Sequence, residues 1–476
     1  MNSTLVLVVA LIVFAFVVSR LLHRYAERVA MVSGIEYVVV GVLIGPLAPH
    51  GLTSAETLES VDLLITLLLG LLGFMVGLHA REALRRFEQF LAGALSALAV
   101  CAVVTVACLG LVQWLVPAYL ADPSPVIVIP VFADETHLYQ LWAADEALWM
   151  ALTLGAAAAV ASSTAIAAAA NRWQAEGPPV VLLKDLAAAG QVLAVFVFGL
   201  ALAGDRAVEA ADGYGLSLVE WALVISVAGA VTGLLFTIFI GGAEDDLRLY
   251  VATIGVVIFA TGIGDALGVS PLFVNLVTGL TVASTSAHSA RLRKNLDQLK
   301  HPTTILLLVF AGMSWTPVSG WLWSIPVVYL LLRLGTRLVA THWAVATFTN
   351  GVEFRRVGGG LLGQGALAAA IALSYAKDHP QTGGLVLSAV LVPMLVSDLF
   401  AVRTLRRVLA NAGAIRPRAE LAAPLEEAAD PDRDPDRDPD PNPDQDPDPN
   451  PDQDPDPDQA EAVPSPTETG DEDQQA

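Results

Sequence analysis

Long apolar stretches, separated by short polar connections, follow one another along the first 410 residues of the chain. A helix needs about 20 mostly apolar residues to cross the roughly 30 Å of hydrocarbon in a bilayer. Stretches near that length run over residues 4–22, 29–48, 61–78, 90–116, 147–170, 180–203, 217–241, 248–265, 271–286, 303–319, 321–346, 358–376 and 383–401. The pattern therefore predicts an all-α polytopic membrane protein with about thirteen transmembrane helices.

The basic residues are sorted between the two sets of alternate connections. One set and the segment after the last span hold 19 Lys and Arg, whereas the other set holds only Arg206 and Lys377. Such residues favour the cytoplasmic side of a membrane. The first stretch is followed, not preceded, by Arg20, Arg24 and Arg28, which is the reverse of a cleaved secretory signal. We therefore expect the N-terminus outside, the C-terminus inside and the cytoplasmic membrane as the location.

Net charge divides the chain into two parts. The formal net charge is -21. The segment from Glu420 onward contains 21 acidic residues and two Arg and so contributes -19, which leaves -2 for residues 1–419. An apolar, nearly neutral body excludes an average soluble protein and a nucleic-acid binder, which would show a basic face. From Asp430 the chain repeats Asp-Pro and has little to bury. We predict a transmembrane domain over 1–410 and a disordered, acidic cytoplasmic tail over 411–476.

Three basic residues fit neither side of the membrane, because they lie within predicted spans together with Asp185: Lys184, Arg333 and Arg337. A charge at the bilayer centre costs about 2.5 to 3.5 kcal/mol on insertion scales, so such groups usually face a protein interior or a water-filled cavity. A rise of 1.5 Å per residue places Asp185 about 8 Å from the cytoplasmic edge, and Arg333 and Arg337 at about 12 and 6 Å. Depth alone does not choose which arginine faces Asp185.

Two predicted spans have sequences that favour an interrupted helix. The fifth reads GAAAAVASSTAIAAAA, whose hydroxyls can bond freed backbone carbonyls, although plain small-residue packing is an alternative. The twelfth reads GGGLLGQGALAAAIAL, where five glycines weaken the helix. A discontinuous helix in each half of a membrane protein points to a transport site. The residues expected at these interruptions are Ser162, Ser163, Thr164, Gly363, Gln364 and Gly365.

These motifs together resemble the monovalent cation:proton antiporters, in the branch of bacterial sodium/proton and potassium/proton antiporters. GVLIGPLAPHGL and LLLGLLGFMVGLHA resemble the family's second and third spans, and VASSTAIAAAA followed by LLKDLAAAG resembles its paired fifth and sixth. GDALGVSPLFVNLVTGLTVASTSAH, FAGMSW, LLLRLGTRL and LLGQGALAAAIAL follow in the family's order. The resemblance covers nearly all of residues 1–410.

The resemblance implies the sodium/hydrogen exchanger fold, with two inverted six-helix repeats, two discontinuous helices that cross, and a homodimer. It makes Asp185 the carboxylate that binds either ion or proton, with oxygen ligands from Ser162, Ser163 and Thr164. Arg333 or Arg337 would neutralise the empty carboxylate. The sequence departs from the family at Lys184, where Asp, Asn or Gln is typical. A neighbouring ammonium favours the ionised carboxylate, whereas burial opposes it.

We therefore expect a secondary transporter that exchanges Na⁺ or K⁺ for protons by alternating access, without a cofactor, and not an enzyme. One exchangeable carboxylate predicts electroneutral exchange. Arg337 matches Asp398 in depth, which predicts a structural ion pair between them. Two alternatives stay open. Lys184 and the charged tail favour a non-transporting membrane sensor or scaffold, whereas the intramembrane cations would suit a symporter of an organic anion.

Overall fold

The computed structural model describes residues 34–45, 55–121, 144–209, 216–240, 246–318, 320–349 and 357–415. Helices dominate these residues, and no strand occurs among them. Eight of the described helices are long and apolar enough to cross a membrane, and Pro271–Thr285 is a shorter apolar helix. The chain is thus an all-α, multi-pass membrane protein. The predicted first span, 4–22, and residues 416–476 of the predicted tail, 411–476, lie outside the described residues.

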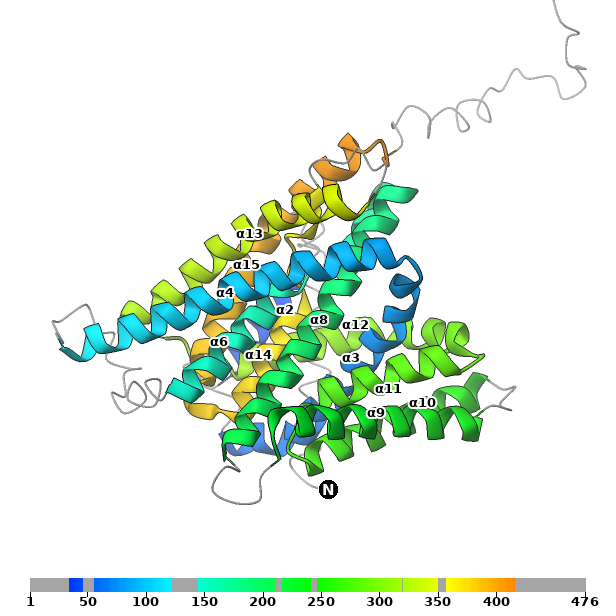
Figure 1. The fold of residues 1–476 in the computed structure, drawn as a ribbon, viewed down its shortest axis with the longest axis horizontal. Coiled ribbons are helices and arrows are strands. Elements are labelled where there is room, and N and C mark those ends of the chain that lie inside the picture. Colours follow the sequence, from blue (N-terminus) through cyan, green and yellow to red (C-terminus); the bar gives the residue numbers. More distant parts are fainter. Residues whose placement is uncertain are drawn as a thin grey trace, which may run out of the picture. The chain divides into compact units, whose positions relative to one another are not determined.

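One set of helices, here called the scaffold group, packs mainly within itself (Figure 1). It consists of α2 (Ile35–Ile44), α3 (Ala55–Arg85), α9 (Leu218–Ile240), α10 (Asp246–Ala266), α11 (Pro271–Thr285) and α12 (Ser289–Met313). The most extensive contact joins α3 to α11, where a Cβ added to Gly73 or Gly77 would lie 2.3 or 2.1 Å from the carbonyl oxygens of Leu272 and Leu276. Glycine therefore allows the two backbones to touch, as is common between membrane helices.

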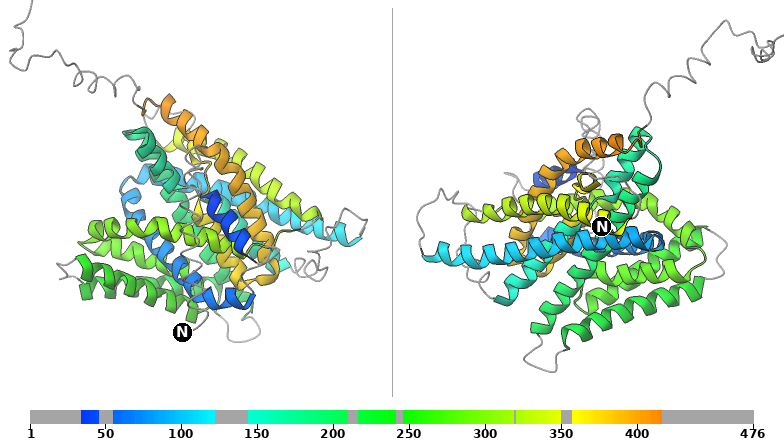
Figure 2. Two further views of the ribbon diagram at one scale, coloured as in Figure 1. Left: turned by 180° about the vertical axis from the view of Figure 1, so that it is seen from behind. Right: turned by 45° about the horizontal axis from the view of Figure 1, so that its top comes forward.

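The remaining helices form the crossing group, which contains both interrupted helices. It consists of α4 (Phe87–Ala121), α6 (Ala144–Ala159), α7 (Ser163–Trp173), α8 (Pro178–Glu209), η2 (Gly320–Trp323), α13 (Ser324–Phe348), η3 (Val357–Leu361), α14 (Ala366–Asp378) and α15 (Pro380–Asn411). Three views show α9 and α10 on one side and α4 and α13 on the other (Figures 1 and 2). Where the two groups meet, α8 packs on α3 and α9, and α14 packs on α12.

Every predicted span after the first overlaps a helix, or an interrupted pair of helices, of the described residues. The two interruptions fall in the fifth and twelfth predicted spans, as their sequences indicated. They separate α6 from α7 at residues 160–162 and η3 from α14 at residues 362–365. The fold thus brings unpaired backbone groups into the interior of a membrane protein, where they need partners.

Candidate ion-binding site

The first interruption is held by the side chains that follow it. Ser162 caps α7, because its Oγ accepts a hydrogen bond from Ala165 N at 3.1 Å and lies 2.9 Å from Thr164 Oγ1. Gln191 of α8 donates through Nε2 to Ala161 O at 2.9 Å and to Ser163 Oγ at 3.1 Å. The hydroxyls and the amide thereby satisfy the backbone groups that the helix leaves free.

The second interruption depends on glycine and on Gln364. Gly365 has φ 72° and ψ 175°, and a Cβ at this position would lie 2.7 Å from Ser162 Oγ. An L side chain is strained in such a backbone conformation. Gln364 is fully buried and donates through Nε2 to Ala157 O at 3.1 Å and to the hydroxyl of Tyr329. Ser162 N donates to Gly363 O at 2.9 Å, so a backbone hydrogen bond joins the two interruptions.

Both intramembrane arginines bind backbone carbonyls rather than carboxylates. Arg333 donates from Nε to Ala158 O at 3.2 Å, from Nη2 to Val160 O at 3.1 Å and from Nη1 to Leu362 O at 2.8 Å. It therefore bridges the two interruptions. These carbonyls lie where α6 and η3 end, which is the negative end of a helix dipole and a favourable place for a cation.

Arg337 lies one turn further along α13 and corrects one prediction. Its Nη2 donates to Ala158 O and Val160 O, both at 3.2 Å, and to Ala159 O. Its Nε and Nη1 atoms find no acceptor among the described residues. The predicted ion pair with Asp398 is absent, because the carbonyls of the first interruption take the guanidinium and Asp398 Oδ1 instead accepts from Gln364 N at 3.1 Å.

Asp185 is buried on α8, with only 3% of its surface exposed, and it is paired with an arginine that the sequence did not single out. Arg86 donates from Nη2 to Asp185 Oδ1 at 2.9 Å and from Nε to Oδ2. Arg86 occupies the single residue between α3 and α4, and its side chain is 42% exposed. Because this contact engages both oxygens of Asp185, neither Arg333 nor Arg337 is its partner in this conformation.

A cavity of about 1300 Å³ connects these groups to the end of the molecule that carries the predicted cytoplasmic arginines. The candidate site residues that line it are Ser162, Ser163, Thr164, Lys184, Asp185, Gly363, Gln364, Gly365 and Asp398. Lys184 is exposed, and it makes no hydrogen bond or ion pair with another described residue. It therefore turns away from the buried side of α8, on which its neighbour Asp185 lies.

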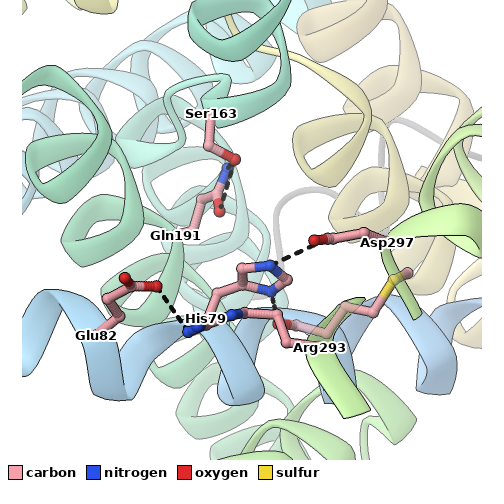
Figure 3. A network of polar contacts seen from close by, with 7 residues as sticks. His79, Glu82, Ser163, Gln191, Arg293 and Asp297 are labelled. Atoms are coloured by element: carbon pink, nitrogen blue, oxygen red, sulfur yellow. Dashed lines mark hydrogen bonds and ion pairs between the residues drawn. The ribbon is translucent and has the colours of Figure 1, made fainter. Parts of the chain in front are cut away.

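Charged pairs between α3 and α12 border the same cavity (Figure 3). His79 Nε2 lies 3.1 Å from Asp297 Oδ1, and Arg293 Nη1 lies 2.6 Å from Glu82 Oε2. Burial opposes ionisation of Asp297, yet the hydrogen bond from His79 holds the pKa of this carboxyl below its ordinary value. Burial lowers the pKa of the nearby Lys300 ammonium, which Asp297 partly offsets. These pairs belong to the scaffold group and so fix one wall of the cavity.

Sequence reasoning missed three members of this site. Arg86 is one of the 19 Lys and Arg residues of the predicted cytoplasmic side, and Asp398 was predicted to form a structural pair with Arg337. Gln191 could have been identified from the sequence as a site residue, since it is a polar residue inside the apolar stretch 180–203 and lies six residues after Asp185. The hydroxyl-rich interruption, by contrast, lies where the motif placed it.

No protein-family model matches the sequence, and no match among curated proteins was found. Solved structures do match. The sodium proton antiporter MjNhaP1 from Methanocaldococcus jannaschii, solved at pH 8, is 14% identical with a TM-score of 0.59, over 85% of this chain and 99% of that one. An electron-microscopy structure of the same antiporter gives 14% identity and a TM-score of 0.56, over 88% and 100% of the two chains. The chain therefore has the fold of a sodium/proton antiporter.

Proposed function

Starting from this antiporter fold, we propose that the chain exchanges a monovalent cation, Na⁺ or K⁺, for protons across the cytoplasmic membrane. The observation that carries the proposal is Asp185, a buried carboxylate that lines a large cavity beside two interrupted helices. One carboxylate that holds either a cation or a proton couples the two fluxes, because the ligands compete for the same oxygens. Ser162, Ser163 and Thr164 supply hard oxygen atoms of the kind that Na⁺ and K⁺ prefer.

In this proposal Arg86 is the cation that neutralises Asp185 while the site is empty. Its guanidinium occupies both carboxylate oxygens, so a transported cation binds only after Arg86 withdraws. Arg333 instead holds the two interruptions together, and Arg337 holds the first one through its Nη2, since both donate to backbone carbonyls. Lys184, exposed in the cavity wall, contributes to the positive potential there rather than a direct contact.

The conformation is proposed to face the cytoplasm. The cavity opens among arginines that the charge bias assigns to the inner side, and ion pairs link the two helix groups at the opposite end. There Lys377 of α14 lies 2.9 Å from Asp62 of α3 and 3.7 Å from Asp265 of α10. Alternating access would open these pairs and close the cavity. The lipid-exposed scaffold helices α9 and α10 suit the contact of a homodimer, as in the family that the motifs resemble.

The decisive experiment is proton flux in vesicles that hold purified full-length protein. We expect an imposed pH gradient to drive Na⁺ or K⁺ movement in the wild type and Asp185→Asn to abolish it. Glu176→Gln, the same change from carboxylate to amide, is the matched control, because Glu176 is exposed and lies outside the cavity. Activity retained in Asp185→Asn would overturn the assignment. A wild type without cation-dependent proton flux would favour a sensor or scaffold, and a bound organic carboxylate would favour a symporter.

A further inference from the structure

A second buried carboxylate lines the same cavity as Asp185. Asp398 lies on α15 and is only 4% exposed. Its Oδ1 accepts the hydrogen bond from Gln364 N at 3.1 Å, at the point where the chain leaves the second interruption and begins α14. Each interrupted helix is thus followed by a helix that brings one carboxylate to the cavity, Asp185 on α8 and Asp398 on α15.

The second oxygen of Asp398 is uncommitted. Oδ2 has no hydrogen-bond partner among the described residues, and it is not one of their fully enclosed unpaired atoms. Because Asp398 borders the cavity, this oxygen opens onto it. A carboxylate that only capped the start of α14 would need no access to water.

The charged residues around Asp398 form no ion pair with it that would stabilise its ionised carboxylate. From α13, Arg333 faces it electrostatically, but the donors of Arg333 are occupied by three carbonyls and no ion pair forms. Arg337 is likewise directed at carbonyls. From α7, Arg172 lines the cavity, whereas η3 and the cavity ends of α6 and α14 carry no titratable side chain. An ionised carboxylate at this depth with only one hydrogen bond is destabilised, so binding of a proton or a cation is favoured.

We propose that Asp398 is a second exchange site, which binds a proton in one half of the transport cycle and releases it in the other. The inference rests on the proposed antiport. In one direction both Asp185 and Asp398 carry a proton. In the other direction Asp185 carries the cation, and Asp398 returns ionised beside Arg333. Two protons then move against one monovalent cation, so each cycle transfers one net positive charge. This replaces the electroneutral exchange that a single carboxylate predicts.

The first test detects the proton without requiring transport. Infrared difference spectra of the purified full-length protein, recorded over a pH titration, report the C=O stretch of a protonated carboxyl group. We expect Asp398→Asn to remove one such band that persists in Asp185→Asn. Asp398→Glu should shift that band, which identifies its owner even if the asparagine variant folds poorly. Spectra in which neither Asp398 variant changes a carboxyl band would overturn the inference, whether or not the protein transports ions.

The second test counts charge. Cation jumps on a supported membrane should produce a sustained current in wild-type protein. Asp398→Asn, whose amide oxygen can still accept from Gln364 N, should lower the number of protons moved per cation from two to one and so lose that current. Unchanged charge per transported cation in Asp398→Asn, or a wild type that transports without current, would contradict a second exchange site. Loss of all flux in wild-type vesicles would instead count against the antiport itself, and the infrared result would still decide the state of Asp398.

Discussion

The crossing group holds two kinds of buried charged side chain, arginines and aspartates, and their environments differ. Arg333 and Arg337 are fully buried: Arg333 binds backbone carbonyls at the ends of α6 and η3, and Nη2 of Arg337 binds carbonyls at the end of α6. Asp185 and Asp398 are almost as deeply buried, but both line the cavity. The arginines therefore meet fixed partners within the protein, whereas the carboxylates face a space from which small ions can reach them. We propose that access to the cavity, rather than burial, distinguishes a charge that binds transported ions from one that only stabilises the fold.

Arg333→Ala should have the largest effect on stability. The change removes three hydrogen bonds from a charged group, each of which contributes about 1.5 to 3 kcal/mol. Ala158 O and Val160 O keep Arg337 as a donor, but Leu362 O loses its link to the first interruption. We expect a large drop in folded yield and in the melting temperature of detergent-purified protein. Arg333→Lys should recover part of this loss, because it keeps the charge but not the three-way geometry.

A contrary result for Arg333 would be equally informative. If Arg333→Ala melted at the normal temperature but had lost transport completely, Arg333 would act in transport rather than in stabilising the fold. It would then be the compensating cation for one of the two carboxylates, as the resemblance to known antiporters implied.

Gly365→Ala should have an intermediate effect. Its backbone has φ 72°, and the new Cβ would meet Ser162 Oγ at 2.7 Å, so we expect a cost of about 1 to 3 kcal/mol. Gly363→Ala is the matched control in the same interruption, because its Cβ would meet its nearest neighbours at an ordinary 3.5 Å. Melting temperature and transport rate should fall clearly in the first variant and little in the second. Equal effects would show that glycine serves another purpose in this segment.

Arg86→Gln should change affinity with little effect on stability. Removing the guanidinium frees both oxygens of Asp185, so the KM for the cation should fall by several-fold, which corresponds to about 1 kcal/mol for a pair with one exposed partner. Arg85→Gln is the matched control, since this neighbouring residue is exposed and does not contact Asp185. A KM that is the same in both variants would mean that Arg86 does not compete with the transported ion.

Much of the fold could be predicted from the sequence, because each helix and each interruption is marked by residues that are consecutive in the chain. Apolar length marks the helices, and runs of Gly, Ala, Ser and Thr mark the interruptions next to Ser162 and Gln364. The partners of the charged residues could not be predicted in the same way. Depth places Arg337 level with Asp398, but rotation about α13 decides what its guanidinium meets, and α13 turns it toward the carbonyls of residues 158–160. Arg86 was hidden among other basic connection residues, because nothing in sequence spacing relates it to α8.

The hydrogen bond from Ser162 N to Gly363 O has a mechanical consequence. If one interrupted helix slid past the other, this bond would break, and the hydrogen bonds by which Arg333 joins Val160 O to Leu362 O would break with it. These hydrogen bonds therefore oppose sliding between the two interrupted helices. Any displacement of the carboxylates across the bilayer should carry both interruptions together, with the compliance located at the contacts of α8 and α14 with α3, α9 and α12.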